Sequence, residues 1–529
     1  MKKLPLAITT FEKIRDSTKN YLYVDKTAIA YQLINNGEYY FLARPRRFGK
    51  SLFIDTLSDL FQAKKTLFEG LAVYKQWDWN KQYPVIHIEF NTGDFTNEKG
   101  IKSRICHILK NNQERLGISC DENSNDNIDI PACFSELIAK TQQKYQQKVV
   151  ILIDEYDKPI LDNIDHKETA LIARELLKTF YSVIKSNDRY LKFVFITGVS
   201  KFSKMNLFSG LNNLTDITTR PEYAAICGYT HQDIKTHFKQ HLETVDLEKL
   251  KEWYNGYDYL GGEENKVYNP YDILLFIDNH CEYKDYWWET GNPSFLIKKL
   301  QEQNYYIPNL ENIIVSEKIL NTFDIERIDL IALLWQTGYL TLAKKIRNFD
   351  ETYDYQLKVP NREIQKSLNV LFLNYLTNQP VNVLANQKLI YRDITEDIRQ
   401  FEVTLNALFS SIPYNNYVNN TISNYEGYYA SVVYAYLSSL GFPCIPEDVT
   451  STGRVDLTIK LPHRIVIIEF KVDNKEQALA QIKQKKYYQK YLAEAKTKNQ
   501  EIYIVGICFA SKEKNITEFK WEKINQFSK

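Results

Sequence analysis

The sequence predicts an α/β protein in three parts: a domain with a parallel sheet over residues 1–225, a mainly helical middle region over 226–395, and a smaller α/β module over 396–529. The length of 529 residues suits about three domains. In the first part, two apolar runs of the kind that form buried strands each end in polar residues. In the last part, two predicted strands carry acids and a lysine. These patterns predict the fold class.

Composition excludes several classes of protein. The 67 basic and 66 acidic residues balance, so the whole chain is not a polyelectrolyte. Seven scattered cysteines without a CxxC pair argue against a zinc ribbon or a disulfide framework. The N-terminus lacks an apolar signal region, and no run approaches the roughly 20 apolar residues of a membrane span. We therefore expect a cytoplasmic protein with no membrane partner. Whether it forms a homo-oligomer is left open.

A phosphate-binding loop is predicted between the apolar run "YYFLA" (39–43) and a helix beginning near Ser51. The connecting residues are "RPRRFGK" (44–50). Strand, tight loop, Gly-Lys-Ser and helix form the context in which such a loop is credible. The first glycine of the general GxxxxGK[ST] pattern is replaced by Arg44.

Each residue of this loop has an expected role. Gly49 lets the backbone approach a phosphate, Lys50 reaches the β- and γ-phosphates, and Ser51 binds Mg²⁺. Arg46 and Arg47 add positive charge, and Phe48 completes the predicted ATP-binding segment together with the loop residues already named.

The run "VVILIDEYDK" (149–158) predicts a central strand that ends in Asp154 and Glu155. An acid at the carboxyl end of a parallel strand, beside a phosphate loop, suits a Mg²⁺ ligand, and its neighbour can polarise the attacking water. A further strand within 190–201 ends in Thr197 and Ser200, which are candidates for sensing the γ-phosphate or for an ordinary strand-end turn.

Several motifs together resemble a known family. They are "YVDKT" (23–27), "RPRRFGKS" (44–51), "LIDEYDKP" (152–159), "TGVSKFSKMNLFSGLNNLTDIT" (197–218), "WYNGY" (253–257) and "VYNP" (267–270). In this order they resemble the prokaryotic AAA-ATPase-like family, which joins a P-loop NTPase domain to a C-terminal PD-(D/E)XK nuclease module. Arg44 fits this family's own loop. The resemblance implies ATP binding and hydrolysis through Lys50, Ser51, Asp154 and Glu155, with Arg220 as a sensor arginine or, more often, a structural one.

The middle region predicts helices and no chemistry. Its segment "DIERIDLIALLWQTGYLTLAKK" (324–345) reads as a helix followed by a strand. Two interpretations stay open: a winged-helix fragment, or a lid that packs on the nucleotide site.

The C-terminal module carries two strands, "GRVDLTIK" (453–460) and "RIVIIEFKV" (464–472), joined by a short turn as a hairpin. Side chains two apart on a strand share a face, so Glu469 and Lys471 lie side by side, and the hairpin can bring Asp456 near them. Two carboxylates and a lysine suit a Mg²⁺ site with a charged neighbour. A surface hairpin with a salt bridge is the alternative.

Flanking elements add to this interpretation. We expect a helix over 423–442 with Glu426 in its first turn, a second helix over 476–492, and a closing strand over 501–509. This order resembles the restriction-endonuclease-like core of the PD-(D/E)XK superfamily. The resemblance implies that Asp456, Glu469 and Lys471 are catalytic, that Glu426 completes the metal site, and that Gln481 holds a polar helix position. Val455 replaces the proline of the superfamily's name.

The sequence thus predicts an ATP-binding and ATP-hydrolysing protein, with ATP and Mg²⁺ or Mn²⁺ as cofactors, that cuts nucleic acid, with DNA favoured over RNA. Glu155 would be catalytic in ATP hydrolysis. Two alternatives remain: a regulatory ATPase whose nuclease-like module binds nucleic acid or protein without cutting, and an interaction protein with an inactive loop.

Overall fold

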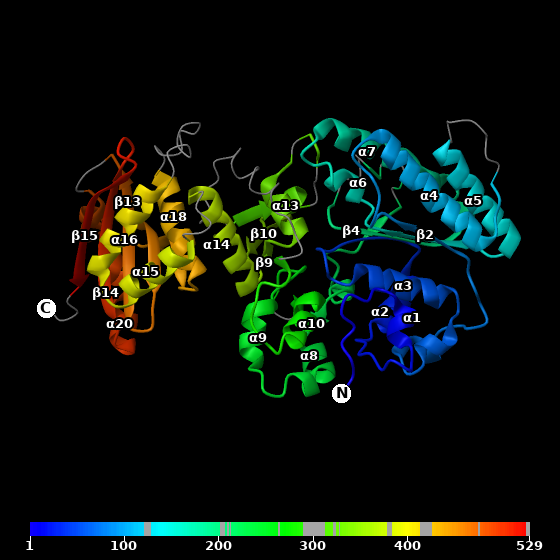
Figure 1. Cartoon of the computed structure of the whole chain (residues 1–529), viewed down its shortest axis with the longest axis horizontal. Helices are drawn as coiled ribbons and strands as arrows, with labels where there is room; N and C mark the ends of the chain where they lie inside the picture. Colours follow the sequence, from blue (N-terminus) through cyan, green and yellow to red (C-terminus); the bar gives the residue numbers. More distant parts are fainter. Residues whose placement is uncertain are drawn as a thin grey trace. The chain divides into compact units, whose positions relative to one another are not determined.

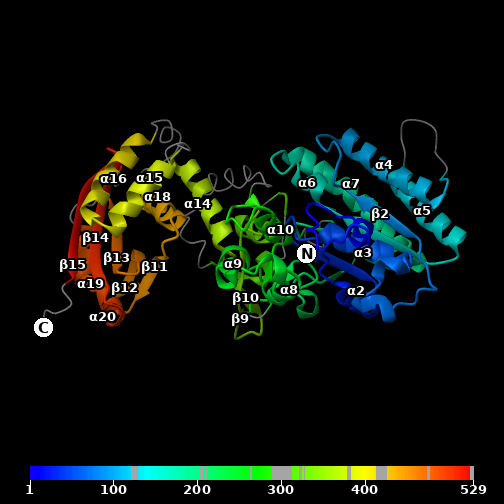
Figure 2. The same cartoon turned by 60° about the horizontal axis from the view of Figure 1, so that its bottom comes forward.

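The computed structural model describes the chain except residues 121–128, 202–206, 209–210, 212, 263–264, 289–312, 321–323, 327, 378–382, 413–425, 474–476 and 525–529. The chain forms two compact units, shown in Figure 1 and, turned, in Figure 2. The N-terminal unit comprises Met1–Gly291 and Ile314–Asn361, and the C-terminal unit comprises Asn292–Ile313 and Arg362–Lys529. Each is described by itself. In the described part of the chain, no helix is both long and apolar enough to reach across a bilayer.

The first two-thirds of the N-terminal unit alternate strands and helices. Its α-helices and strands up to residue 216 are α1 (Phe11–Arg15), α2 (Thr27–Asn36), β1 (Tyr39–Ala43), α3 (Lys50–Phe61), β2 (Val85–Glu89), α4 (Glu98–Leu116), α5 (Ile130–Tyr145), β3 (Val149–Asp154), α6 (Lys158–Leu161), α7 (Lys167–Ser186), β4 (Leu191–Gly198) and β5 (Thr215–Asp216). The strands expected at 39–43, 149–154 and within 190–201 are confirmed.

These strands form one sheet in the order β2-β3-β4-β1-β5, and every pair is parallel. Helices α4, α5 and α7 cover one face, and α1, α2 and α3 cover the other (Figures 1 and 2). Strands β1 and β3 are buried along their whole length, as expected for strands covered on both faces. The α/β fold with a parallel sheet is therefore confirmed.

The middle region adds helices and two small sheets. Its elements are β6 (Tyr229–Thr230), α8 (His231–His237), α9 (Leu247–Tyr254), β7 (Val267–Tyr268), α10 (Pro270–Asp278), β8 (Ile313–Ser316), α12 (Glu317–Leu320), α13 (Leu330–Thr337), β9 (Thr341–Arg347) and β10 (Tyr353–Lys358). Helices α8–α10 share a hydrophobic core with Leu22 and Val24 from near the N-terminus. The β9–β10 hairpin follows α13 directly and belongs to a sheet of order β8-β10-β9.

The middle region packs on the phosphate loop, and its lid interpretation stays a prediction. The indole Nε1 of Trp287 donates to the carbonyl of Arg46 at 3.1 Å, and the rings of Trp287 and Tyr339 meet edge to face, 5.3 Å apart. Gly338 approaches the loop so closely that a Cβ atom there would lie 2.8 Å from Pro45. Residues directly after α13 therefore pack against the loop.

The C-terminal unit contains α14 (Arg362–Thr377), α15 (Val383–Thr395), α16 (Ile398–Ser411), α18 (Glu426–Ser439), β11 (Cys444–Thr450), β12 (Gly453–Lys460), β13 (Arg464–Val472), α19 (Gln477–Lys485), the 3₁₀ helix η9 (Tyr487–Tyr491), α20 (Leu492–Lys498), β14 (Glu501–Ala510) and β15 (Asn515–Ile524). The sheet order is β11-β12-β13-β14-β15, in which only β13 and β14 pair in parallel. The predicted hairpin and closing strand are confirmed.

Helices cover both faces of this sheet. Tyr429 of α18 stacks on Phe509 of β14 with ring centroids 4.2 Å apart, on the face where α16 also packs through Phe409. On the opposite face, Ile482, Tyr487 and other residues of α19 and η9 enter a core with the strands. This second face carries the candidate nuclease residues.

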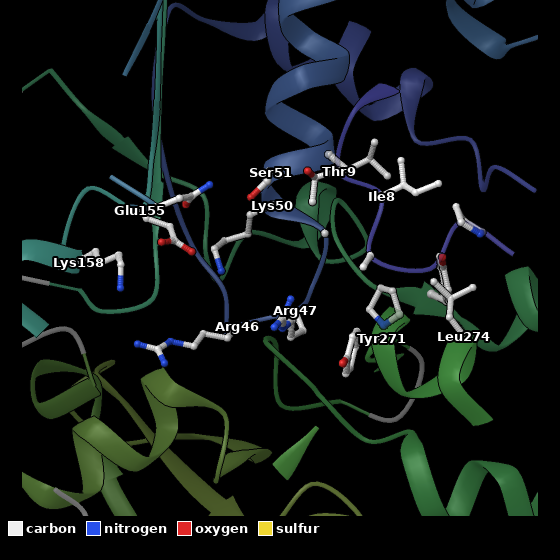
Figure 3. A pocket seen from close by; sticks show the side chains of 17 residues that line it. Ile8, Thr9, Arg46, Arg47, Lys50, Ser51, Glu155, Lys158, Tyr271 and Leu274 are labelled. Atoms are coloured by element: carbon white, nitrogen blue, oxygen red, sulfur yellow. The ribbon is translucent and has the colours of Figure 1, made fainter. Parts of the chain in front are cut away.

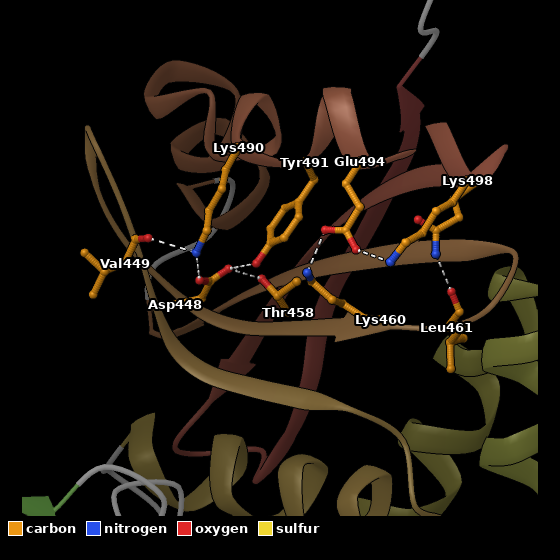
Figure 4. A network of polar contacts seen from close by, with 10 residues as sticks. Asp448, Val449, Thr458, Lys460, Leu461, Lys490, Tyr491, Glu494 and Lys498 are labelled. Carbon is orange, nitrogen blue, oxygen red and sulfur yellow. Dashed lines mark hydrogen bonds and ion pairs between the residues drawn. The ribbon is translucent and has the colours of Figure 1, made fainter. Parts of the chain in front are cut away.

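The single helix expected over 476–492 is wrong in its length, because α19 ends at Lys485 and Lys486 adopts a left-handed conformation with φ 52°. Tertiary contacts override helix propensity here. The buried carboxylate of Asp448 accepts from the Tyr491 hydroxyl at 2.5 Å and from the Thr458 hydroxyl at 2.7 Å, and Lys490 pairs with it too (Figure 4). These bonds fix η9 on β11 and β12.

Candidate functional site

The phosphate loop connects β1 to α3. Gly49 directly precedes the helix with φ 90°, and Arg47 adopts φ 68°; both values are left-handed, where glycine meets no steric cost. Arg44 is not among the described residues with positive φ. The loop therefore does not need a glycine at the position where the general pattern places its first one.

Arg44 instead has a structural role. Its side chain is 1% exposed, and its guanidinium donates to the backbone carbonyls of Ala43 and Thr218 at 2.9 Å and of Tyr223 at 3.3 Å. The guanidinium also lies 3.6 Å from the ring centroid of Tyr259. Arg44 thus ties the end of β1 to two later segments of the chain.

Lys50 lies at the centre of the loop. Its Nζ donates to the carbonyls of Arg44 at 3.0 Å and Pro45 at 2.9 Å. Burial lowers the pKa of Lys50, and the nearby carboxylates of Asp154 and Glu155 oppose that shift. A cation held by two carbonyls and facing two acids can move to a phosphate without losing hydrogen bonds, because the phosphate oxygens replace the carbonyl oxygens.

Ser51 lies near Asp154 at the end of β3. Burial raises the pKa of Asp154, and the Ser51 side chain opposes that shift. A hydroxyl and a carboxylate that lie near each other provide the oxygen ligands that Mg²⁺ prefers, so the pair fits the expected cation. Glu155 follows with φ 51°, and burial raises the pKa of its carboxyl as well.

A cavity of about 410 Å³ opens beside these residues (Figure 3). Its lining residues are Pro5, Ala7, Ile8, Thr9, Arg46, Arg47, Gly49, Lys50, Ser51, Leu52, Asn91, Glu155, Lys158, Tyr229, Pro270, Tyr271 and Leu274. One end is cationic and is formed by the loop. The other end is mainly apolar and is formed by the N-terminal segment and α10. The volume is typical of small-molecule sites, which span roughly 300–1,000 Å³.

Not every predicted residue reaches this cavity. Phe48 is fully buried and meets the Tyr257 ring edge to face at 4.7 Å, so it serves the loop as an anchor. Ser200 donates to the buried carboxylate of Asp157. Thr197 is fully buried, and within the described part of the chain its hydroxyl has no hydrogen-bond partner. The sensor role of these two residues stays a prediction.

Arg220 is exposed and does not line the cavity. It directly precedes the short 3₁₀ helix Pro221–Tyr223. The geometry of the described residues therefore gives it no contact with the predicted nucleotide site.

Two polar residues at the end of β2 escaped the sequence analysis. Glu89 pairs in register with Asp154 on the neighbouring strand, and the Asn91 side chain donates to the Glu89 carboxylate and lines the cavity. Burial and the nearby Asp154 and Glu155 carboxylates raise the pKa of Glu89. The signal was present, because "VIHIEFN" (85–91) is a second apolar strand that ends in an acid.

The C-terminal unit brings Asp456 and Glu469 together across the β12–β13 hairpin. The backbone N–H of Phe470 donates to Asp456 Oδ2 at 2.7 Å, and the N–H of Asp456 lies 3.4 Å from Glu469 Oε2. Each carboxylate thus contacts a backbone N–H of the strand that carries the other carboxylate. Burial and the Asp456 charge raise the pKa of Glu469 to about 7, although Lys471 opposes this shift.

Lys471 and Gln481 converge on the same carboxylate. Lys471 Nζ lies 3.0 Å from Glu469 Oε1, and the Gln481 side-chain amide donates to that oxygen. Gly506 makes the second contact possible: it pairs with Glu469 in the sheet, and a Cβ atom there would lie 2.3 Å from the backbone nitrogen of Leu479 in α19. The predicted polar position on the helix therefore faces Glu469.

Glu426 is the first residue of α18, but its side chain lies outside the described part of the structure. Among the described residues, no group of three or more acids, histidines or cysteines is arranged to hold a metal ion. Asp456 and Glu469 supply two carboxylates, whose mutual repulsion a divalent cation would relieve. The pair fits such an ion as a partial ligand set.

Comparison with known proteins agrees with this two-part architecture. A family model described as "Predicted AAA-ATPase" matches residues 5–208, and a model of the PD-(D/E)XK nuclease superfamily matches residues 424–519. The chain is 41% identical over 528 residues to a curated protein named "Uncharacterized protein in vnfD 5'region" from Azotobacter chroococcum mcd 1, and the match covers 99% of each chain. This chain therefore belongs to the AAA-ATPase-like family, and its C-terminal module belongs to the PD-(D/E)XK nuclease superfamily.

Proposed function

We propose that the protein binds and hydrolyses ATP and that its C-terminal unit cleaves nucleic acid, DNA in preference to RNA, with a divalent metal ion. The main support for ATP binding and hydrolysis is the cavity. Lys50, Ser51 and Glu155 line one end of it, and apolar residues line the other. Such a cavity has a cationic end for a triphosphate and an apolar end for a base.

In the ATP half, Lys50 exchanges the carbonyls of Arg44 and Pro45 for phosphate oxygens. Glu155 orients a water molecule and accepts its proton. Ser51 and Asp154 would hold Mg²⁺, which neutralises phosphate charge when bound.

The base lies at the apolar end of the cavity. Ile8 and Leu274 offer aliphatic surface on two sides, and Tyr271 offers a ring over which the Arg47 guanidinium lies at 4.9 Å from the centroid. A bound nucleotide would thus contact both the phosphate loop and α10. Nucleotide binding therefore holds α10 against the phosphate loop.

In the nuclease half, Asp456 and Glu469 would hold Mg²⁺ or Mn²⁺, which polarises a phosphodiester when bound. Lys471 is no metal ligand. It orients a water molecule or stabilises charge that develops on the phosphate. Gln481 fixes the orientation of the Glu469 carboxylate.

One observation favours a second candidate, a regulatory ATPase whose nuclease-like unit binds nucleic acid or protein without cutting it. The described residues provide only two carboxylates at the predicted metal site, and Lys471 pairs with one of them. If the positive charge of Lys471 takes the place of the metal ion beside these carboxylates, the unit can still bind a partner but lacks the metal ion that cleavage needs.

The test uses the purified full-length protein. ATP hydrolysis is measured first, and cleavage of single- and double-stranded DNA and RNA is then measured with Mg²⁺ or Mn²⁺, with and without ATP. Cleavage lost in Asp456→Ala supports the proposal. ATP hydrolysis with no cleavage of any substrate supports the regulatory candidate, and failure to bind ATP contradicts both.

A further inference from the structure

Asp55 lies one helical turn after Ser51 on α3 and makes a contact that the ATP mechanism above does not use. Its Oδ2 accepts a hydrogen bond from the backbone N–H of Phe11 at 2.6 Å. Phe11 is the first residue of α1 and is fully buried. One rigid helix thus carries a predicted Mg²⁺ ligand and the acceptor for the start of α1.

This contact bears on the cavity wall. Four of the cavity-lining residues, Pro5, Ala7, Ile8 and Thr9, immediately precede α1. The first N–H groups of a helix need acceptors from outside the helix, yet the side chain of Thr10 before α1 makes no capping hydrogen bond. Asp55 supplies an acceptor from α3 in its place. The position of the wall therefore depends on α3.

Stability alone does not explain an acid at position 55. Asp59 is on the same helix one turn later, and burial and the nearby Asp55 charge are among the causes that raise the pKa of Asp59 to about 6. The adjacent Lys64 pairs with Asp59 at 2.8 Å and with Glu12 at 3.5 Å. Two acids in a partly buried site repel each other, so removing Asp55 relieves a cost elsewhere on α3.

We propose that Asp55 is a positioning residue. Through its hydrogen bond to Phe11, it holds the base-binding wall, which is the cavity-lining segment 5–9, at a fixed distance from the phosphate loop. The inference rests on the proposed binding of ATP. Because the wall contacts the nucleoside and not the phosphates, loss of the Asp55–Phe11 bond weakens the binding of ATP and leaves the binding of a bare triphosphate unchanged. An effect on folding or on the loop itself would weaken both ligands.

The test compares two ligands in the full-length protein with Mg²⁺: ATP and inorganic tripolyphosphate, each titrated by calorimetry. In Asp55→Ala we expect about a tenfold loss of affinity for ATP, which corresponds to about 1.4 kcal/mol of binding free energy, and no change for tripolyphosphate. Asp55→Asn keeps an acceptor oxygen and should restore ATP affinity. Asp55→Ser, whose side chain is too short to reach Phe11, should behave like Asp55→Ala and serves if that variant does not fold.

Equal losses for both ligands, or unchanged ATP affinity in Asp55→Ala and Asp55→Ser, would overturn the positioning role while ATP binding itself stands. If the wild-type protein binds tripolyphosphate but not ATP, the apolar end of the cavity holds no base. The positioning role of Asp55 is then wrong as well. If the wild type binds neither ligand, the proposed ATP site is wrong. The three failures are therefore distinguishable.

Discussion

Lys471 Nζ lies 3.0 Å from Oε1 of Glu469, two residues before it on the same strand. The Lys471 cation and the Gln481 amide, which both contact this buried carboxylate, stabilise its charge. Even so, burial and Asp456 raise the pKa of Glu469 to about 7. The lysine only partly offsets the cost of the buried charge.

The first prediction concerns pH and metal. A carboxyl whose pKa is higher in the folded state than in the unfolded state makes folding weaken as pH rises, here between about 4.5 and about 7, by a total on the order of 3 kcal/mol. A bound divalent cation would relieve that loss. Mn²⁺ should therefore raise the melting temperature more at about pH 8 than at about pH 6.

Glu469→Gln is the matched control, because it keeps the shape and removes the titration. Its melting temperature should not depend on Mn²⁺ at either pH. An identical Mn²⁺ shift in the wild type at both pH values would contradict the raised pKa.

The second prediction separates metal binding from cleavage. Asp456→Ala should abolish nucleic-acid cleavage and Mn²⁺-dependent stabilisation and leave ATP hydrolysis largely intact, because it removes a ligand. Lys471→Ala should keep the stabilisation and lose cleavage, because lysine is no ligand. Melting curves with Mn²⁺ and a cleavage assay check both variants. If wild type and Asp456→Ala shift alike with Mn²⁺, the two acids are only a strand-end pair.

The third prediction separates ATP binding from turnover. Lys50→Ala removes the main cation for the β- and γ-phosphates, so ATP affinity should fall by at least about tenfold. Glu155→Gln removes only the acceptor for the water proton, so binding should persist and turnover should fall by about 10²-fold or more. Calorimetry and phosphate release measure the two effects. Hydrolysis at the wild-type rate in either variant would refute the assignment.

The fourth prediction concerns Arg44. Restoring the general loop pattern with Arg44→Gly should destabilise the N-terminal unit by about 3–5 kcal/mol, because buried carbonyls of Thr218 and Tyr223 lose their donor. Arg46→Gly, at an exposed loop position, is the control and should cost much less. Thermal unfolding of both variants measures the difference. A more stable Arg44→Gly protein would contradict the structural role.

The fifth prediction concerns the approach of α19 to the sheet. Gly506→Ala places a methyl group against the Leu479 backbone and should cost about 1–3 kcal/mol by overpacking. It should also reduce cleavage, because Gln481 moves from Glu469. Gly262→Ala is the control, since a Cβ there meets nothing within 4 Å. Equal stability and cleavage in the two variants would show that α19 can shift freely.

Much of the fold was predictable because local patterns agree with it. The apolar runs at 39–43 and 149–153 are long enough, and apolar enough, to be nothing but central strands, and they formed β1 and β3 as expected. The hairpin of β12 and β13 followed from alternation and a short turn. The sequence could also place Glu469 and Lys471 on one strand face, since that depends only on strand geometry.

Other features depend on residues far apart in the chain, and only the tertiary structure decided them. Lys486 breaks the helix after α19 because Asp448, in another strand, holds η9 in place. Lys26 of "YVDKT" pairs with Asp233, 207 positions later, at 2.7 Å.

The two candidate sites show the same division. The sequence by itself determined which residues could carry the chemistry, because a P-loop lysine or a strand-end acid is recognisable from its neighbours. The tertiary structure decided what each one meets: Arg44 is buried and ties the end of β1 to later segments, and segment 5–9 forms part of the cavity wall. Such pairings arise from packing between distant segments, for which a local sequence pattern carries no signal.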